Sequence, residues 1–407
     1  MKALTYIRLS FMMFLEFFIW GGWFVTMGTF LLQTLNASGG DTAMAYSTQS
    51  WGAIIAPFII GLIADRYFNA ERILGVLHLV GAFLMYQLSQ ATEFTNFYPY
   101  VLGYMIAYMP TLALVNSVSF NQMKDPALFF PFVRVWGTGG WIVAGFLISI
   151  FAWDSSQGVA DGLLSNTFLM TAIASAILGV YSFTLPKTPP QAKGSKASLS
   201  DILGLDALKL LKDKNFLVFF LSSVLICIPL AFYYQNLSPY LVESGVENST
   251  LKASFGQISE VGFMLLLPFF FKRFGFKMTI LVGMLAWTVR YLLFAYGDAG
   301  ELAFMIIIGI LLHGICYDFF FVSGQIYTDS KAGEKIKSAA QGLITLATYG
   351  VGMLIGFYVA GKITDANLLE DGGHTWKAIW TFPAIFAGAV LVLFALFFKN
   401  EKIEYKA

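Results

Sequence analysis

The sequence predicts an all-α membrane protein with twelve transmembrane helices in two six-helix pseudo-repeats. Of its 407 residues, 57% are hydrophobic and only 12% are charged, whereas soluble domains carry about 25% charged residues. Apolar runs of roughly 20 residues recur, each long enough to cross a hydrocarbon core about 30 Å thick. Because backbone polar groups need internal partners in lipid, these runs must be helices. The predicted spans are 5–33, 43–64, 72–91, 97–120, 131–152, 165–185, 215–241, 252–271, 277–296, 302–327, 338–363 and 377–398.

A polar segment separates the sixth predicted span from the seventh. Residues Pro186 to Lys214 are rich in Lys, Pro, Ser and Gly, a composition typical of a linker. The segment is too short to hold a separate domain. The predicted divisions are an N-terminal bundle at 1–186, a cytoplasmic linker at 187–214 and a C-terminal bundle at 215–407.

The two halves echo each other in sequence. Arg66 in "GLIADRY" and Arg273 in "PFFFKRFG" each follow the second span of their half. Two six-helix repeats with a substrate site near the membrane midplane between them are the design of a secondary transporter that works by alternating access. The repeat therefore predicts a transporter.

Lysine and arginine residues concentrate in the loops on one side of the predicted spans. The opposite loops carry mainly acidic residues, such as Asp154, Asp161, Asp298 and Glu301. Because cytoplasmic loops carry the excess of Lys and Arg, both termini and the linker are predicted to be cytoplasmic. The first span is too long for a removable signal peptide and lacks a cleavage region, so it should stay as a helix.

The residues that would support metal or enzyme chemistry are few. Cys227 and Cys316 lie inside spans and are expected to be small packing residues. The three histidines, His78, His313 and His374, show no metal-ligand spacing. No nucleophile and base stand together in the sequence, so we expect neither an enzyme nor a cofactor or metal site.

A polar face is predicted on the fifth span. Arg134, Thr138, Trp141 and Gly145 follow one another at i, i+4, i+7 and i+11 and so share one helix face. That face offers a fixed cation, a hydroxyl and an indole, which suit substrate hydroxyls and the stacking of a planar ring. The alternative is that Arg134 only extends toward the cytoplasmic interface.

The eighth span carries an amide and a carboxylate on one stripe. Gln257 and Glu260 lie there with Met264, and both polar groups can accept hydrogen bonds from sugar hydroxyls. Glu260 could also take up a proton, since desolvation favours its neutral form. The alternative is a structural ion pair with Arg290.

The tenth span carries two predicted faces. His313, Tyr317 and Gly324 form one face, and Asp318, Phe321 and Gln325 form the other, adjacent one. Asp318 is the only acid in that span and is the first candidate for proton coupling, because an intramembrane acid needs a partner or a proton. His313 either titrates near neutral pH or is a core residue with satisfied hydrogen bonds.

The seventh span contains Pro229, so its outer half is predicted to bend or partly unwind. Tyr234, Gln235 and Asn236 would then present polar groups to a substrate. The alternative is that they form a polar rim at the outer membrane interface, where tyrosine is common.

The first span holds a lone carboxylate in the stretch "FLEFFIWGGW". Burying an unpaired carboxylate among apolar groups is costly. Glu16 shares a helix face with Trp20 and Trp23, so we predict that it borders the central cavity. There it would act as an auxiliary acid that tunes cargo or proton affinity.

Two resemblances to known families support a transporter. "GLIADRY" resembles the loop signature of the major facilitator superfamily, with Gly61, Asp65 and Arg66 at matching positions. Phe68 and Asn69 stand where that signature has Gly-Arg. The resemblance implies the major facilitator fold and a cytoplasmic charge lock in which the aspartate pairs with the arginine.

The chain also resembles, over nearly its whole length, the bacterial proton-coupled nucleoside permeases. The matching stretches are "FFIWGGW", "AYMPTLALVNSVSF", "RVWGTGGW", "GLDAL", "QISE", "LPFF", "AWTVRYLLFAYGD", "YDFFFVSG" and "SAAQG". The resemblance implies a monomeric carrier of the bacterial inner membrane that imports nucleosides such as uridine and adenosine by proton symport. Its partners would be nucleoside, protons and lipid, with no nucleic acid.

The same resemblance assigns roles to individual residues. It implies substrate contacts at Arg134, Thr138, Gln257 and Glu260, and proton coupling at Asp318. The full set of candidates for substrate binding is Arg134, Thr138, Trp141, Tyr234, Gln235, Asn236, Gln257, Glu260, His313, Tyr317 and Phe321, and for proton coupling Asp318, Glu260 and Glu16.

Three positions depart from the permease pattern. His313 stands where a tyrosine contact is expected, and Glu16 stands where the permeases tend to carry glutamine. The Gln and Asn contacts of the permeases' seventh span fall on Ala231 and Tyr234 without gaps. These departures leave the cargo preference open.

Other functions remain as alternatives at this point. A proton-coupled sugar symporter would use the same carboxylate and arginine chemistry, and competition by free ribose as strong as by nucleoside would favour it. A drug-proton antiporter lacks support, because "GTGGW" has no Gly-Pro pair. A non-transporting membrane sensor would show binding without turnover.

Overall fold

The computed structural model describes residues 2–59, 67–124, 126–190 and 205–401. Apart from an isolated bridge between Leu368 and His374, the regular structure in these ranges is helical. Ten of the described helices are long and apolar enough to cross a membrane. The described chain therefore confirms an all-helical membrane protein. The number twelve stays a prediction, because α11 (Ser249–Tyr296) joins the predicted eighth and ninth spans across a kink at Gly275, where φ is 76°.

The chain divides into two compact units. Residues 1–202 with 247–251 form the N-terminal unit, and residues 203–246 with 252–407 form the C-terminal unit. The predicted charge lock of Asp65 and Arg66 lies outside the described residues.

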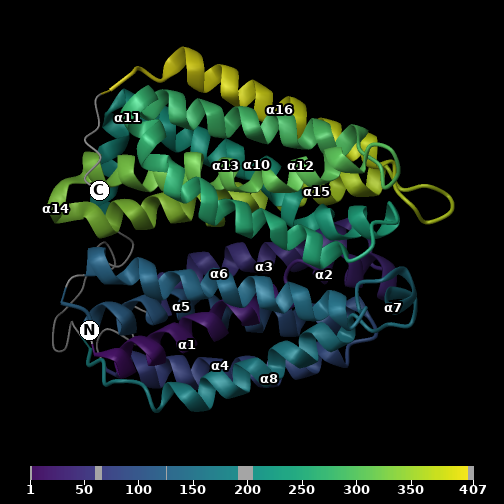
Figure 1. The fold of residues 1–407 in the computed structure, drawn as a ribbon, viewed down its shortest axis with the longest axis horizontal. Coiled ribbons are helices and arrows are strands. Elements are labelled where there is room, and N and C mark those ends of the chain that lie inside the picture. Colours follow the sequence, from purple (N-terminus) through teal and green to yellow (C-terminus); the bar gives the residue numbers. More distant parts are fainter. Residues whose placement is uncertain (1, 60–66, 125, 191–204, 402–407) are drawn as a thin grey trace. The chain divides into compact units, whose positions relative to one another are not determined.

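Six long helices build the N-terminal unit and run lengthwise beside one another (Figure 1). The helix α1 packs against α6, and α4 packs against α8. A Cβ atom on Gly140 would overlap the carbonyl oxygen of Phe14, so only glycine allows the close approach of α6 to α1. The elements are α1 (Ala3–Gly21), α2 (Met27–Thr29), η1 (Phe30–Thr34), α3 (Gly39–Ile59), α4 (Ala70–Ser89), α5 (Phe94–Asn121), α6 (Pro126–Ile150), α7 (Ser156–Ala160) and α8 (Ser165–Ser182).

In the C-terminal unit, α10 packs against both α15 and α16. The short 3-10 helix η3 begins this unit within the predicted linker. The elements are η3 (Leu205–Lys212), α10 (Lys214–Glu243), α11, α12 (Ala303–Leu311), α13 (His313–Tyr317), η4 (Asp318–Val322), α14 (Ser323–Thr345), η5 (Leu346–Gly352), α15 (Met353–Ala366) and α16 (Trp376–Phe397).

The predicted unwinding after Pro229 is wrong. The helix α10 continues through both Pro229 and Pro239 to Glu243. The hydroxyl of Tyr291 donates a hydrogen bond of 2.5 Å to the Pro229 carbonyl. This bond ties α10 to α11 beside the proline.

Within the described ranges, three segments are wound as π-helix: η1, η4 and η5. A π-helical turn holds more residues than an α-helical turn, so it shifts the register of the side chains that follow. The predicted face of Asp318, Phe321 and Gln325 is therefore wrong in part. Asp318 and Phe321 are buried, whereas Gln325 is exposed.

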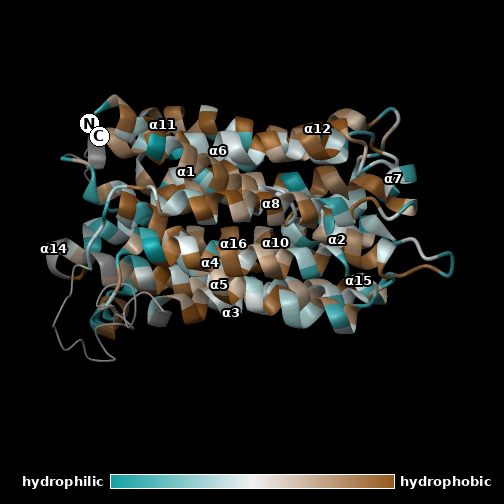
Figure 2. Ribbon diagram, turned by 90° about the horizontal axis from the view of Figure 1, so that it is seen from below, coloured by the Kyte–Doolittle hydropathy of each residue, from teal (hydrophilic) through white to brown (hydrophobic). Residues whose placement is uncertain are grey.

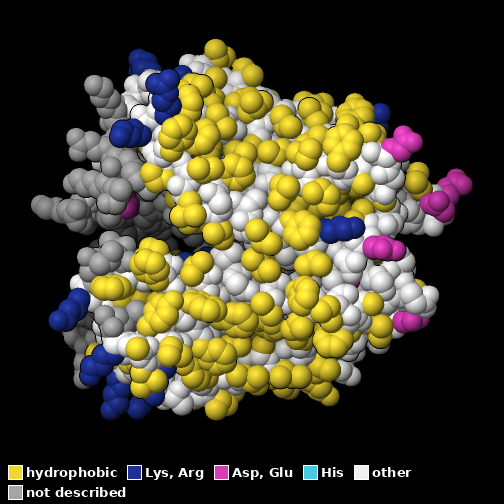
Figure 3. Space-filling model, in the orientation of Figure 1, with side chains coloured by type: hydrophobic (Ala, Val, Ile, Leu, Met, Phe, Trp, Pro, Cys, Tyr) yellow, Lys and Arg dark blue, Asp and Glu magenta, His cyan; other side chains and the backbone are white. Residues whose placement is uncertain are grey.

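The two kinds of charge separate to opposite ends of the helices within each unit. Figure 2 shows hydrophobic residues along the middle of the helices and hydrophilic residues toward their ends. In Figure 3, most of the Lys and Arg side chains lie at one end of the helices and the visible Asp and Glu side chains mainly at the other, where a few basic groups also lie. This distribution is what a membrane-crossing helical bundle with basic cytoplasmic loops requires.

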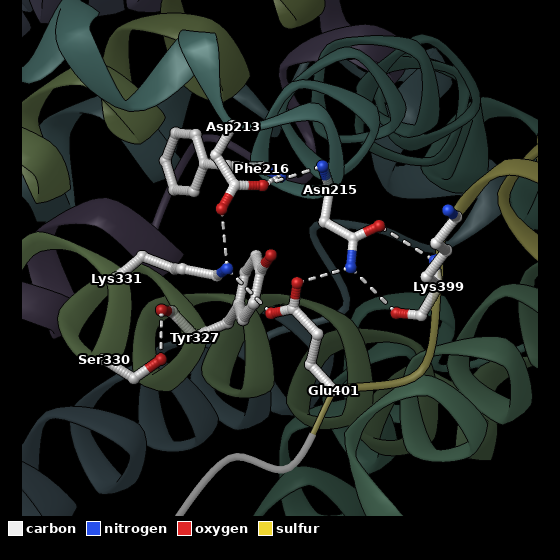
Figure 4. A network of polar contacts seen from close by, with 8 residues as sticks. All are labelled: Asp213, Asn215, Phe216, Tyr327, Ser330, Lys331, Lys399 and Glu401. Atoms are coloured by element: carbon white, nitrogen blue, oxygen red, sulfur yellow. Dashed lines mark hydrogen bonds and ion pairs between the residues drawn. The ribbon is translucent and has the colours of Figure 1, made fainter.

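A polar network fastens the segment after α16 to the beginning of α10 (Figure 4). The ammonium of Lys331 lies 2.8 Å from both an Asp213 and a Glu401 oxygen. Asn215 donates to the Lys399 carbonyl and accepts from the Lys399 amide, at 3.0 and 2.9 Å. The hydrogen bond from Lys331 holds the pKa of Asp213 below its usual value, and backbone amides at the start of α10 act in the same direction.

Candidate functional site

The predicted polar face of α6 is present in the N-terminal unit. The guanidinium carbon of Arg134 lies 3.9 Å from the centre of the Phe17 ring on α1. The Trp141 ring meets Trp20 edge-on at 5.8 Å. Arg134, Thr138 and Trp141 are all half-buried. The helix therefore offers a cation, a hydroxyl and an aromatic plane together.

A fully buried arginine organises the C-terminal unit. The Arg290 guanidinium on α11 lies 3.5 Å from the centre of the Tyr233 ring on α10, as a cation–π contact. Its Nη1 atom is 3.2 Å from Nδ1 of His313 on α13. The imidazole of His313 stacks on Tyr233 with ring centres 5.2 Å apart. Three helices thus contribute to one cluster.

The contact with Arg290 fixes the protonation of His313. A guanidinium can only donate hydrogen bonds, so the Nδ1 atom of His313 must accept. The ring proton is then on Nε2, and the imidazole is neutral. A second proton would set a cation against Arg290 in a buried site, which is costly. His313 is therefore a neutral hydrogen-bond donor in this arrangement.

Asp318 is the first residue of η4. Its side chain is completely buried, and neither carboxyl oxygen has a hydrogen-bond partner among the described residues. An ionised carboxylate there would be an unpaired buried charge, which costs several kcal/mol. The side chain is a group that needs a proton or a ligand.

An aromatic group surrounds the same stretch of chain. The hydroxyls of Tyr317 and Tyr349 are 3.1 Å apart, and the Phe321 ring contacts both tyrosine rings. Tyr349 belongs to η5 and was not among the sequence candidates. Its contacts cross between two π-helical segments, which the α-helical pattern of the sequence does not reveal.

Gln235 and Asn236 are completely buried in α10, so the alternative of a polar rim is wrong. Neither amide atom of Gln235 has a hydrogen-bond partner in the described part of the chain. Asn236 accepts a bond of 3.3 Å from Thr364, and its Nδ2 has none there. Tyr234, beside them, is half-buried. Buried unpaired amides are rare and call for a partner such as ordered water or a ligand.

Gln257 and Glu260 lie half-buried on α11, as predicted for one stripe, while Met264 is exposed. The amide of Gly314 donates to the Ser259 hydroxyl at 3.1 Å, so this part of α11 lies against α13. Arg290, on the same long helix, contacts Tyr233 and His313. The stripe and the arginine cluster therefore meet the same short helix.

Glu16 differs from its predicted setting. It is completely buried within the N-terminal unit rather than bordering a cavity. Its Oε2 atom lies 2.8 Å from Nε2 of His78 on α4, and its Oε1 accepts a 2.6 Å bond from Thr111 on α5. His78 was not predicted from the sequence as the partner of Glu16. The signal available was that each of the two groups is a lone titratable residue in an apolar stretch.

Comparison with known proteins decides the family. Residues 3–403 match the family model described as nucleoside H+ symporter. The chain belongs to the nucleoside H+ symporter family. Curated relatives include a putative nucleoside transporter, YegT, of Escherichia coli K12, 44% identical over 99% of this chain and 96% of the relative. The xanthosine permease of the same organism is 35% identical over 98% of each chain.

Solved structures agree with this assignment to the nucleoside H+ symporters. A crystal structure of the nucleoside transporter NupG with one aspartate replaced by alanine is 29% identical, has a TM-score of 0.90, and covers 97% of this chain and 100% of its own. The POT family transporter PepTSo, 14% identical with a TM-score of 0.72 over 98% of each chain, shares the fold alone. The relatives in the family are transporters rather than enzymes.

Proposed function

We propose that this protein imports nucleosides by proton symport through alternating access. The observation that carries the proposal is Asp318, a buried carboxyl group without a partner among the described residues, in a chain of the nucleoside H+ symporter family. A carrier that couples to protons needs such a group, because binding a proton changes its charge and its fit to a closed environment. The relatives named as nucleoside and xanthosine permeases support the class of cargo.

Each unit offers its own contacts for a nucleoside. In the N-terminal unit, Arg134 and Thr138 can bond to ribose hydroxyls or base carbonyls, and Trp141 can stack on the base. In the C-terminal unit, Gln257 and Glu260 suit hydroxyl groups. His313, as a neutral donor on Nε2, suits a carbonyl or ring nitrogen of the base.

Further contacts come from two buried amides and from aromatic side chains. The buried amides of Gln235 and Asn236 are proposed to bind cargo or ordered water, and Tyr234 stands beside them. Tyr317 and Phe321 supply aromatic surface. These groups would favour a flat, polar ring over a sugar alone.

The proton step follows from the cost of a buried charge. With the site open to the outside, Asp318 takes up a proton and becomes neutral. The neutral side chain can be enclosed as the carrier closes, whereas the carboxylate cannot be without several kcal/mol of desolvation penalty. Opening to the cytoplasm returns the carboxyl group to water, where it releases the proton. Glu260 is a second candidate for this role.

The orientation in the membrane is part of the proposal. The basic end of each unit is placed at the cytoplasm, so both termini lie inside a bacterial inner membrane. The two units are proposed as the two halves that move during alternating access, and the carrier as a monomer.

Substitution of Asp318 by Asn tests the coupling. Asparagine imitates the protonated acid but cannot release a proton. Purified D318N in proteoliposomes should still exchange labelled uridine for unlabelled uridine, yet lose uphill accumulation driven by an inward proton gradient. The exposed acid Asp161 gives the control variant D161N, which should accumulate uridine normally. Uphill accumulation by D318N at the wild-type level would remove Asp318 from the mechanism.

A sugar symporter remains the second candidate, because arginine and carboxylate groups also bind sugars. Competition for uridine uptake separates the two. Free ribose should compete far more weakly than adenosine if the base is recognised, and equal competition would favour the sugar carrier.

A further inference from the structure

A closed polar network lies inside the N-terminal unit and is not used by the transport mechanism above. Its members come from four helices: Glu16 on α1, His78 on α4, Thr111 on α5 and Ser175 on α8. All four side chains are 0–1% exposed. Each link in the network is within hydrogen-bond distance, so the position of its hydrogens can be worked out one group at a time.

The serine fixes one nitrogen of the histidine. The single hydroxyl hydrogen of Ser175 goes to the carbonyl oxygen of His78, at 2.9 Å, and a carbonyl can only accept. The Ser175 oxygen must then accept from Nδ1 of His78, which is 3.2 Å away. Nδ1 therefore carries a hydrogen.

The carboxyl group fixes the other nitrogen. The Thr111 hydroxyl lies 2.6 Å from Oε1 of Glu16 and 2.5 Å from the Tyr108 carbonyl, and its one hydrogen is shared between these two acceptors. Whichever of them it favours, Oε2 of Glu16 lies 2.8 Å from Nε2 of His78. Two lone pairs cannot face each other at that distance, so one proton must lie between them. It belongs either to an imidazolium beside a carboxylate or to a carboxylic acid beside a neutral imidazole. In both forms the pair has no net charge.

We propose that Glu16 and His78 form a second proton-binding site, which holds one proton inside the N-terminal unit. Losing this proton would leave the pair with an uncompensated negative charge or with two lone pairs facing each other. Both are costly in a buried site, so the proton is held. The inference does not depend on the nature of the cargo, and it separates this proton from the one proposed for Asp318.

The groups around the pair support a resident proton. From α5, Tyr104 and Tyr108 face Glu16, and the Tyr108 hydroxyl donates to the Glu16 carbonyl at 2.7 Å. From α6 the charged group is Arg134, which lies over the ring of Phe17. The helix α8 contributes the Ser175 hydroxyl. A neutral pair suits these mainly uncharged neighbours.

Other charges on the same helices are farther away. Arg8 is eight residues from Glu16, and Glu71 and Arg72 are six or seven residues from His78. At 1.5 Å per residue these separations are roughly 9–12 Å along the helix axes. Glu16 and His78 are therefore each other's main electrostatic partners.

The backbone at Glu16 also contacts an aromatic group of the unit. Tyr108, which donates to the Glu16 backbone carbonyl, packs on Trp20 with ring centres 5.7 Å apart, and Trp20 contacts Trp141.

Glu16→Gln is the variant that removes the proton and keeps the hydrogen bonds. The glutamine oxygen can accept from Thr111, and its amide can donate to Nε2 of a neutral His78 whose Nδ1 still donates to Ser175. The folded variant thus holds one proton fewer than the wild type. In the unfolded chains the proton numbers are equal above about pH 5, because the glutamate is then ionised.

The test is the pH dependence of the stability difference between wild type and E16Q, measured by unfolding in the same detergent from pH 5 to 8. Folded wild type holds one proton more than folded E16Q. The unfolding equilibrium constant of E16Q divided by that of wild type should therefore fall about tenfold for each unit that the pH rises. Other titrating groups are shared and cancel. A difference that is constant with pH would overturn the proposal.

A spectroscopic measurement keeps the proposal testable if E16Q unfolds too easily. With 15N-labelled histidine, the His78 signals are assigned by their loss in H78Q. The Nδ1 atom of wild-type His78 should carry a bound hydrogen throughout pH 5 to 8. If Nδ1 of His78 carried no hydrogen, it could not donate to Ser175, and the proposal would be wrong.

Discussion

Two buried histidines, one in each unit, show how a single neighbour decides what an imidazole can do. His78 faces the carboxyl group of Glu16 at 2.8 Å, whereas His313 faces the guanidinium of Arg290 at 3.2 Å. The carboxyl group of Glu16 can share a proton with His78, whereas the positive charge of Arg290 opposes a second proton on His313. The N-terminal histidine therefore shares a proton, and the C-terminal histidine is a neutral donor.

The difference teaches that burial alone does not set the charge of a histidine. Both rings are at most 3% exposed. Desolvation works against the cation in both places, yet only His78 has a nearby anion to compensate. The two sites differ because the neighbour of His78 is a carboxyl group, which can accept hydrogen bonds, and the neighbour of His313 is a guanidinium, which can only donate them.

Removing the histidine from the acid should have the largest effect. In His78→Gln, Glu16 keeps hydrogen bonds from the amide and Thr111 but loses the group that neutralises it. An uncompensated buried charge costs about 3–5 kcal/mol, so unfolding at pH 7 should require much milder conditions. The measurement is the unfolding midpoint in detergent.

The double variant E16Q/H78Q is the matched control. Two amides can bond to each other without a charge, so most of the lost stability should return. If H78Q were as stable as the double variant, Glu16 would not depend on His78 to neutralise its charge.

Removing the arginine from His313 should reverse the behaviour of that ring. In Arg290→Met, Nδ1 of His313 loses its donor and can accept a proton. Burial still disfavours the cation, so the folded variant takes up this proton only at low pH, but more readily than wild type. Its stability relative to wild type should therefore rise as the pH falls, by less than about 1.4 kcal/mol per pH unit.

The sign of that shift separates the two histidines. The advantage of wild type over R290M should shrink as the pH falls, whereas its advantage over E16Q should shrink as the pH rises. Unfolding of the three proteins at pH 5, 6, 7 and 8 measures both. Equal signs would remove the contrast between the sites.

The smallest effect is expected at the solvent-accessible charges of Figure 4. Asp213→Asn keeps a helix cap but loses the ion pair to Lys331, which is worth about 0.2–1 kcal/mol at a partly exposed site. Because the folded pKa of Asp213 is lowered, its contribution is complete above the unfolded value of about 3.9. It is lost as the pH falls through the folded value.

The measurement is the unfolding midpoint of wild type and D213N between pH 3 and 7, at low and high salt. Salt should reduce the difference, as it does for exposed pairs. The control is D206N, because the pair of Asp206 with Lys209 is exposed and should add no measurable stability. A loss in D213N as large as in H78Q would erase the distinction between buried and exposed charges.

Much of the fold could be predicted from the sequence, because the membrane imposes helices on long apolar runs. The polar face of Arg134, Thr138 and Trp141 could be predicted too, since it needs only the α-helical repeat. The continuity of α10 through Pro229 could not, because the contacts around this proline, such as the Tyr291 hydroxyl on the Pro229 carbonyl, come from residues far away in the sequence.

The site was harder to predict where it depends on contacts between helices. Glu16 and His78 are 62 residues apart, and no local pattern joins them. Tyr349 in η5 meets Tyr317 at the end of α13, 32 residues away, and no local pattern joins these two either. Helical periodicity predicts faces within one element, not the partner that a face will meet.

The π-helical winding of η4 limits the insertions and deletions that this part of the chain can tolerate. A residue removed from Asp318–Val322 would rotate everything after it by about 100°, the angle of one α-helical residue. Gly324 would then leave the Phe219 ring, and Tyr327 would leave the stack it forms with Phe276. At this place the number of residues constrains the protein as tightly as their identity, so substitutions should be tolerated where insertions and deletions are not.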